Sequence, residues 1–504
     1  MKRRGKKFLL VLCLASILSS SLNASRPEEE IRIGSKKFTE SVILADIASK
    51  LAGSIGATVM HRQELGGTRL LWGALLAGEI DVYPEYTGTL MGEMFAREGV
   101  RDQASLGQAL AKRGLLISRS LGFSNAYGLG MAAGRAELLR ISKISDLPRH
   151  ASLRFGLGDE FLSRADGWPA VQATYGLSAA DVRGLDHDIA YKGLAEGLID
   201  VMDVYRTDPE VEYYGVRTLD DDLHIFQEST AILLYRADLR QRAPRALSAM
   251  LRLEGRIDQQ LMIGMNRAVK VDRRSESEVA AQFLAANFSL IDTQPLEGLA
   301  RRLVRRTIEH LKLTTISLGA AILVALPLGV IAARRPVLGR AILAAASIVQ
   351  TIPSLALLVF MIPILGIGPG PAIAALFLYS LLPIIRNTAT ALQDIPPSIR
   401  ISAIALGLTP SRRLTLIELP MASPAILAGM KTAAVINVGA ATLGALIGAG
   451  GYGQPIFTGV RLDNFGLILE GAVPAALLAL LVQGLFDLAE RYLTPRGLRL
   501  KQPV

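Results

Sequence analysis

The sequence has few residues suited to covalent or metal chemistry. Its 504 residues include one cysteine, Cys13, and five histidines. A single cysteine excludes an internal disulfide framework and a cysteine-based metal cluster. Four of the histidines are scattered along the chain without the spacing of metal ligands; they are His61, His150, His187 and His224. We therefore predict no metal site, and no Ser-His-Asp constellation is evident.

Charged and aromatic residues are also sparse. Charged residues make up 20% of the chain and aromatic residues 6%, whereas 50% are hydrophobic and the mean hydropathy is +0.35. This composition argues against a disordered, fibrous or nucleic-acid-binding protein. The net charge of +10 and the pI near 9.7 are explained if Lys and Arg gather on the cytoplasmic loops of a membrane protein.

A phosphate-binding loop is missing from the sequence. The pattern Gly-x-x-x-x-Gly-Lys-Ser/Thr does not occur, and the only Gly-Lys pair is Gly5-Lys6. Because a loop that cradles the phosphates of ATP needs that backbone geometry, we predict no ATP-binding site of this type in the chain. The sequence therefore predicts a protein that is not an enzyme and that holds no cofactor of its own.

Residues 1–25 have the pattern of a secretory signal. Five cations precede an apolar run from Phe8 to about Leu18, and small residues follow up to Ala24. Cys13 follows Leu12, where a lipoprotein signal requires a small residue, so we interpret it as part of the apolar run. The segment is either a cleaved signal peptide or an uncleaved signal anchor.

Residues 28–295 have the composition of a soluble α/β domain. Short β-type runs at 31–35, 154–158 and 231–235 alternate with helical patterns, which predicts a largely parallel sheet. The stretch is longer than one typical domain, so we expect two lobes that share crossovers near 129–133 and 233–237.

The remainder of the chain has the character of a membrane domain. Five apolar segments, each long enough to cross a bilayer, lie at 312–332, 341–363, 370–388, 424–449 and 465–489. Their Gly, Ala and Pro content is typical of closely packed spanning helices. We predict an all-α domain of about five transmembrane helices over 312–490 and a cytoplasmic tail over 491–504.

The cations indicate the orientation. If the signal exports residues 28–295, the predicted cytoplasmic segments contain Arg334, Arg335, Arg340, Arg386, Arg400, Arg412, Arg413, Arg491, Arg496, Arg499 and Lys501. The opposite loop 364–369 has no cation and loop 450–464 has only Arg461, as the positive-inside rule requires. The exception is a cluster at 301–306, for which we predict an interfacial helix on lipid headgroups within a linker at 296–311.

The loop 399–424 is the most informative part of the membrane half. Ala403, Gly407, Ile417 and Pro420 are spaced for a helix, a glycine-permitted turn and a second helix. Spacing alone leaves two interpretations open, a projecting knob that a soluble partner grips and a solvated loop.

This loop resembles the coupling loop of binding-protein-dependent ABC importer permeases, although Ile401 and Ser402 stand where that family has Glu-Ala. Three further motifs, at 350–358, 378–388 and 448–456, resemble the osmoprotectant (glycine betaine/choline) branch of these permeases. The resemblance implies that two membrane domains pair as a homodimer in the bacterial inner membrane. It also implies that separate ATPase subunits, which carry ATP and Mg²⁺, dock on the loops.

The exported half resembles the solute-binding domain of the same branch, through motifs at 34–41, 64–89, 159–168 and 199–208. The resemblance implies a two-lobed α/β clamp, the type II periplasmic-binding-protein fold, that closes over a quaternary ammonium compound. Such a cation cannot donate hydrogen bonds and is recognised by aromatic faces. The implied cage residues are Tyr86, Tyr127 and Tyr205, and the implied partners for a ligand carboxylate are Lys36, Thr89 and Arg164.

Two departures from the family pattern bear on the ligand. Glu228 and Ser229 stand where a Pro-Pro-Tyr motif often supplies a cage wall, and Asn125 stands where some members have an aspartate beside the ammonium. We expect Glu228 to replace that negative charge, which suits a larger or more polar cation. Glycine betaine, choline, carnitine and the betaine-like amino acid ergothioneine all remain open.

We therefore predict a fused binding protein and permease of an ABC importer for quaternary ammonium solutes. Two other classes are kept as alternatives. A membrane sensor or ligand-gated channel would also carry a clamp on membrane helices, and an anchored extracellular enzyme would reveal itself by turnover of a ligand.

Overall fold

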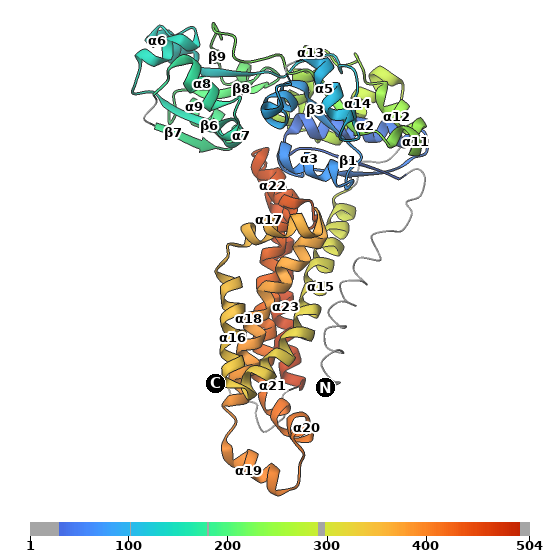
Figure 1. Cartoon of the computed structure of the whole chain (residues 1–504), viewed down its shortest axis with the longest axis vertical. Helices are drawn as coiled ribbons and strands as arrows, with labels where there is room; N and C mark the ends of the chain where they lie inside the picture. Colours follow the sequence, from blue (N-terminus) through green and yellow to red (C-terminus); the bar gives the residue numbers. More distant parts are fainter. Residues whose placement is uncertain (1–29, 101, 179–180, 291–297, 494–504) are drawn as a thin grey trace.

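The computed structural model describes residues 30–100, 102–178, 181–290 and 298–493. The predicted signal, including Cys13, and the cations Arg496, Arg499 and Lys501 of the tail lie outside the described residues. A two-lobed α/β part lies at one end of a long helical part (Figure 1). The two parts correspond to the two halves that the sequence predicts.

The first lobe is built on a mixed five-stranded sheet with the order β2-β1-β3-β10-β4. β1 pairs in parallel with β2 and β3, whereas β10 runs antiparallel to β3 and β4. The strands are β1 (Glu30–Gly34), β2 (Thr58–Arg62), β3 (Val82–Tyr86), β4 (Leu115–Ile117) and β10 (Ala231–Arg236). The type II clamp is thus confirmed, and the sheet is less uniformly parallel than the sequence suggests.

Helices cover both faces of this sheet and bury its apolar side chains in two clusters. α2 is an example, because twelve of its fifteen residues are buried. The helices are α2 (Thr39–Gly53), α3 (Thr68–Leu76), α4 (Thr87–Thr89), α5 (Gln103–Ala111), α11 (Leu239–Arg242), α12 (Pro244–Leu251), α13 (Gln259–Lys270) and α14 (Glu276–Phe288). A π-helical turn, η1 (Leu90–Met94), and a 3₁₀ turn, η2 (Ala96–Glu98), follow α4.

The second lobe has its own small sheets. β5 lies between β8 and β9 in antiparallel pairing, β6 pairs with β7 in parallel, and a bridge from Phe155 to Val201 joins the two sheets. The strands are β5 (Tyr127–Ala132), β6 (Arg154–Gly158), β7 (Asp181–Leu185), β8 (Met202–Tyr205) and β9 (Val216–Thr218). The helices are α6 (Ala133–Leu139), η3 (Ile144–Arg149), α7 (Asp159–Ser163), α8 (Trp168–Tyr175), α9 (His187–Ala195) and α10 (Glu210–Tyr213).

The crossovers between the lobes lie earlier in the chain than predicted. The chain leaves the first lobe after β4 and returns before β10, so the connections are 118–126 and 219–230. A bridge between Ser124 and Thr230 holds them side by side. The predicted positions 129–133 and 233–237 were wrong because they fall on β5 and β10, whose apolar residues are strand core.

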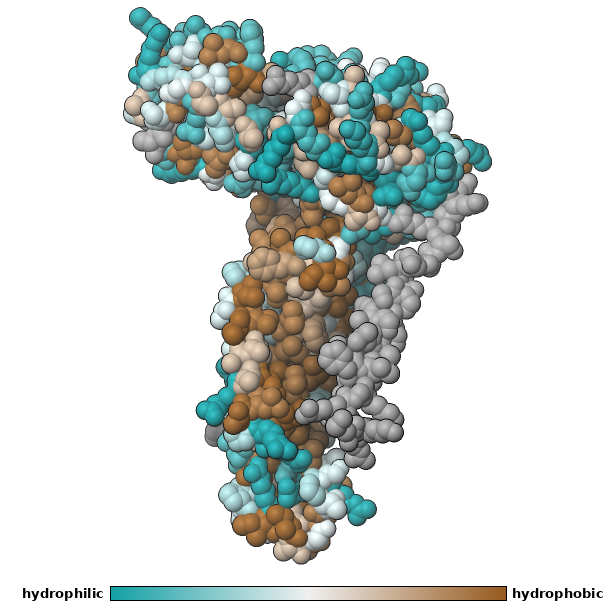
Figure 2. Space-filling model, in the orientation of Figure 1, coloured by the Kyte–Doolittle hydropathy of each residue, from teal (hydrophilic) through white to brown (hydrophobic). Residues whose placement is uncertain are grey.

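Helices of the second half fill the stalk below the clamp, and Figure 2 shows an apolar surface over most of its length. Among the described residues, four helical segments are long and apolar enough to cross a membrane, and a bent pair, α16 with α17, makes a fifth if it is one span. The helices are α15 (Leu299–Arg334), α16 (Pro336–Thr351), α17 (Ser354–Leu365), α18 (Pro369–Gln393), α21 (Leu419–Ala440), η5 (Ala441–Ile447), α22 (Gly453–Arg461) and α23 (Phe465–Leu493).

The second predicted crossing, 341–363, is bent by 101°. The bend falls at Ile352 and Pro353, where Ile352 has an extended backbone. The residue before a proline disfavours the helical region, so α16 ends here and α17 leaves in a new direction. Apolar length alone, which defined this segment in the sequence, contains no information about such a break.

The arginine cluster at 301–306 does not form a separate interfacial helix. α15 runs without a break from Leu299 to Arg334. Arg302 pairs with Glu470 of α23 at 3.0 Å, and Arg306 pairs with the same carboxylate. This acid draws two of the cluster's arginines to α23. Deeper in the helices, Asn437 donates to Ser317 and accepts from Ser380, at 3.0 Å each, a polar link typical of packed membrane helices.

The loop at the far end of the stalk folds as a helix, a turn and a helix. α19 (Pro397–Ala405) and α20 (Pro410–Arg413) flank Gly407, whose φ of +74° strongly favours glycine. A π-helical turn, η4 (Leu414–Glu418), leads into α21. The buried Glu418 pairs with Arg334 of α15 at 3.0 Å and with Arg413 at 2.9 Å, which fixes the loop to the membrane helices.

The first lobe rests directly on the other end of the stalk. The loop residue Ile367 packs into a core cluster of this lobe, and its N–H donates to Glu79 at 2.6 Å. Thr458 of α22 donates to Glu64 at 2.7 Å, and Gly448 lies against Leu65. The loops predicted to be extracytoplasmic therefore contact the clamp, and the loop 399–424 is at the opposite end (Figure 1).

Candidate functional site

A cavity of about 240 Å³ lies between the two lobes. The first lobe contributes the start of α2, the end of β3 and part of α13, and the second contributes β5, α7, α9 and β8. The crossovers contribute residues 125, 225–227 and 229. Every lobe movement therefore changes this cavity. Its size suits a small organic molecule.

The cationic side chains of the cavity already have acidic partners. Lys36 pairs with Glu85 at 2.5 Å and lies 5.5 Å from the centre of the Tyr86 ring. The guanidinium of Arg164 donates two bonds to Asp166, at 2.8 and 2.6 Å, and a third to the Thr89 hydroxyl at 3.2 Å. The side chain of Asp166 therefore occupies the forked donors with which an arginine binds a carboxylate.

Aromatic rings form another side of the cavity. The rings of Tyr127 and Tyr205 lie 4.8 Å apart, and their hydroxyls are hydrogen-bonded at 3.0 Å. Phe226 and Phe38 also line the cavity, and Phe226 is 6.5 Å from Tyr127. Arg164 lies 5.3 Å from the centre of the Tyr127 ring. The Tyr127 ring is thus already in contact with one cation.

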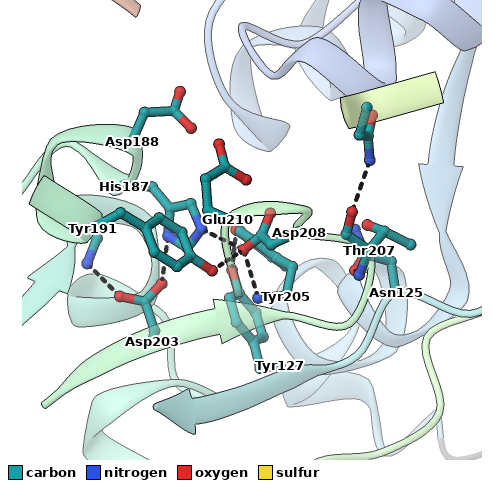
Figure 3. A network of polar contacts seen from close by, with 12 residues as sticks. Asn125, Tyr127, His187, Asp188, Tyr191, Asp203, Tyr205, Thr207, Asp208 and Glu210 are labelled. Carbon is teal, nitrogen blue, oxygen red and sulfur yellow. Dashed lines mark hydrogen bonds and ion pairs between the residues drawn. The ribbon is translucent and has the colours of Figure 1, made fainter. Parts of the chain in front are cut away.

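A network of buried charges supports Tyr205 from behind (Figure 3). His187 lies between Asp203, at 3.2 Å, and Asp208, at 2.8 Å, and Asp208 also accepts from the Tyr205 N–H. Burial lowers the pKa of His187, but the two carboxylates outweigh it and raise this pKa well above 6.5. Burial likewise raises the pKa of Asp208, yet His187 and Lys270 bring it down to about 2.

Lys270 joins the lobes through the same network. It comes from α13 of the first lobe and pairs with Asp188 at 2.7 Å and with Glu210 at 2.9 Å, both in the second lobe. The ion pairs of Lys270 therefore cross the opening between the lobes.

Glu40 is the acidic residue at the end of the cavity nearest Tyr86. It is 6% exposed and accepts hydrogen bonds from Tyr86, from Asn125 at 3.0 Å and from Asn266 at 2.9 Å. Burial raises the pKa of its carboxyl above 4.5. These three hydrogen-bond donors are all uncharged groups.

The cavity brings together eight of the nine predicted ligand residues, which are Lys36, Tyr86, Thr89, Asn125, Tyr127, Arg164, Tyr205 and Ser229. Glu228 is not among the lining residues. Its side chain is 66% exposed and pairs with Arg206 at 2.8 Å, whereas the next residue of the connection, Ser229, is buried. The prediction that Glu228 supplies the charge inside the site is therefore corrected.

Sequence reasoning missed several lining residues: Phe38, Glu40, His187, Thr207, Asp208, Phe226, Asn266 and Lys270. Glu40 could have been predicted from the sequence, since it lies four residues after Lys36 within the motif 34–41. Asn266 and Lys270 come from α13, where no motif pointed to the site. Within the described part of the chain, no group of three or more His, Cys, Asp or Glu side chains could hold a metal ion.

Comparison with protein families covers both halves. Residues 29–286 match the substrate binding domain of the ABC-type glycine betaine transport system, and residues 325–498 match the binding-protein-dependent transport system inner membrane component.

Among individual proteins, the chain is 43% identical over 201 residues to the choline transport system permease protein OpuBB of Bacillus subtilis, a match that covers 40% of this chain and 93% of the relative. It is 42% identical over 198 residues to the osmoprotectant import permease protein OsmW of Salmonella typhimurium, with 38% and 92% covered. A crystal structure of a glycine betaine/carnitine/choline ABC transporter shares 22% identity at a TM-score of 0.44, with 51% of this chain and 98% of that chain covered.

The two family matches account for the two-lobed clamp and for the helical stalk beneath it. Neither family is one of enzymes, and the second consists of inner membrane components. The chain therefore belongs to the ABC-type glycine betaine transport family, as a substrate-binding domain fused to a binding-protein-dependent inner membrane permease.

Proposed function

We propose that this chain captures a quaternary ammonium solute outside the cytoplasmic membrane and passes it inward through its own membrane domain. Glycine betaine, choline and carnitine are the solutes named for its relatives. The observation that carries the proposal is the inter-lobe cavity, which combines tyrosine faces with fixed charges of both signs. Aromatic faces attract a cation that offers no hydrogen-bond donor, by about 0.5–2 kcal/mol each.

We assign roles to the residues of this cavity on the same basis. Tyr86, Tyr127 and Tyr205 form the walls around the ammonium, with Asn125 and Ser229 beside them. Lys36, Thr89 and Arg164 receive the carboxylate of a zwitterionic ligand. Because Arg164 is engaged by Asp166, a carboxylate must displace that partner, whereas choline need not.

The energy for transport comes from a separate ATPase subunit in this proposal. No phosphate-binding loop occurs in the sequence, and the loop 399–424 projects from the stalk with exposed apolar side chains at Ile401, Ile404, Leu406 and Leu416. Exposed apolar side chains of this kind mark a protein contact. Ala403, Gly407, Ile417 and Pro420 give the loop its shape, and a homodimer of membrane domains presents two such loops.

The division of labour along the chain follows from these assignments. Residues 28–295 bind the solute, 296–311 link the clamp to the membrane domain, and 312–490 form the permease. Fusion keeps the clamp at high effective concentration over its own permease.

Ligand titration of the full-length chain in detergent micelles tests the proposal. Calorimetry and the fluorescence of Trp72 and Trp168, the only tryptophans, would follow the addition of glycine betaine, choline, carnitine, ergothioneine and glutamate. We expect a quaternary compound to bind, and Tyr127→Ala to weaken it about tenfold. Tyr213→Ala, at an exposed tyrosine of the same lobe, is the matched control. Binding of glutamate alone would contradict the proposal.

A further inference from the structure

The acidic residue Glu40 occupies a distinctive position in the cavity. It is the second residue of α2, it is buried, and it lines the cavity beside two of the proposed ligand residues. Its Oε1 accepts from the Tyr86 hydroxyl and from Asn125 Nδ2, and its Oε2 accepts from Asn266 Nδ2. Both oxygens therefore have hydrogen-bond donors, and all three donors are uncharged.

The other charged groups of the cavity are compensated. Lys36 has Glu85 and Arg164 has Asp166. Asp188 and Asp208 each have a cationic partner, which is Lys270 for the first and His187 for the second. The half-buried Glu160 accepts from the Thr68 hydroxyl and interacts electrostatically with Arg164. No ion pair to Glu40 is found within the described residues, and the charge that acts on it most is the negative Asp208.

A buried carboxylate without a cation is costly to keep ionised, and a cation brought next to it recovers that free energy. The hydrogen bonds that Glu40 already accepts also determine which type of cation it favours. Because its oxygens already accept hydrogen bonds, an incoming ammonium with N–H donors gains less than usual here. A quaternary ammonium contributes charge and no donor, which matches what the carboxylate lacks.

We propose that Glu40 is the counter-charge for the cationic head of the ligand and makes the cavity select a positively charged solute over a neutral molecule of the same shape. This inference rests on the proposed function and adds a specificity-determining residue to it. Glu40 takes the role that the sequence suggested for Glu228, which the structure places on the surface.

The test compares choline with 3,3-dimethyl-1-butanol, in which carbon replaces the charged nitrogen. Dissociation constants for both would be measured by calorimetry on the full-length chain in detergent micelles. The wild type is expected to prefer choline, and Glu40→Gln is expected to reduce this preference about tenfold. Glu40→Met, which removes the charge without an amide, should do the same if the glutamine variant folds poorly.

Glu228→Gln provides the matched control, since it removes a carboxylate that is exposed to solvent and does not line the cavity. It should leave the preference within about twofold. A purely structural role for Glu40 would weaken both ligands equally and leave the ratio unchanged, which would overturn the inference. If the wild type binds no quaternary compound, the proposed function itself fails; an unchanged ratio with intact choline binding refutes only the role of Glu40.

Discussion

Arg461 of the membrane domain donates to Glu64 of the binding domain at 2.6 Å. The same guanidinium donates to Glu276 at 2.8 Å and to the Thr39 hydroxyl. Thr39 is the neighbour of Glu40 at the start of α2, so this contact lies directly beneath the ligand cavity. Arg461 is also the one cation of the loop 450–464, and its charge serves the docking of the clamp.

Replacement of Arg461 should loosen the clamp from its permease. Arg461→Ala leaves Glu64 and Glu276 facing each other without a cation, and breaking a buried pair in this way costs about 3–5 kcal/mol. Docking can be measured by disulfide formation between cysteines at 63 and 454, whose native glutamine side chains are hydrogen-bonded at 3.3 Å. The background for this assay is Cys13→Ser.

We expect Arg461→Ala to slow this cross-link several-fold. Arg256→Ala, at an exposed arginine of the binding domain, controls for loss of a cation. An unchanged cross-linking rate in Arg461→Ala would show that the contact does not hold the two halves together.

Protonation of His187 should stabilise the binding domain. Its pKa is raised well above 6.5 in the folded protein, against the effect of burial, by Asp208 and Asp203. A raised pKa means that this stabilisation is fully present below pH 6.5 and is lost as the pH rises from 6.5 through the raised value. Thermal unfolding followed by tryptophan fluorescence should therefore show a melting temperature that declines over that range.

His187→Gln removes the titrating group and should flatten this decline, with a lower melting temperature at pH 6.5. The comparison variant is His150→Gln, at a half-buried histidine outside the network. An equally steep decline in His187→Gln would assign the pH dependence to another group.

Glu418 should be essential for the shape of the loop 399–424. It is buried and pairs with Arg334 and Arg413, and Arg400 lies at 4.0 Å. Glu418→Gln removes the negative charge from three arginines that are partly solvated, so we expect a loss of about 1–3 kcal/mol. The measurement is co-purification of the ATPase subunit, which should fall several-fold, whereas ligand binding at the other end stays intact. Retention of the ATPase at the wild-type level would refute this role.

Local motifs explain which parts of the site could be predicted. Lys36, Tyr86 and Thr89 lie at the ends of strands or at helix starts within short recognisable motifs, and the backbone brings such positions to the cavity. Gly407 could be predicted because its positive φ is a requirement of the local turn and not of a distant contact. These features depend on a few neighbouring residues.

Tertiary contacts explain what the sequence did not reveal. Whether Glu228 or Glu40 faces the cavity depends on the direction of a crossover and of α2, and neither follows from composition. Lys270 reaches the site only because α13 packs across the opening between the lobes. The pairing of Arg306 with Glu470 likewise depends on a distant partner.

Uptake by cells tests the central claim most directly. A strain without other quaternary ammonium uptake would express the chain with its ATPase subunit and receive labelled choline or glycine betaine. The account predicts saturable uptake that Tyr127→Ala and Glu418→Gln both reduce about tenfold, the first by weaker binding and the second by lost coupling. Absence of uptake by the wild type, or uptake that neither substitution changes, would contradict it.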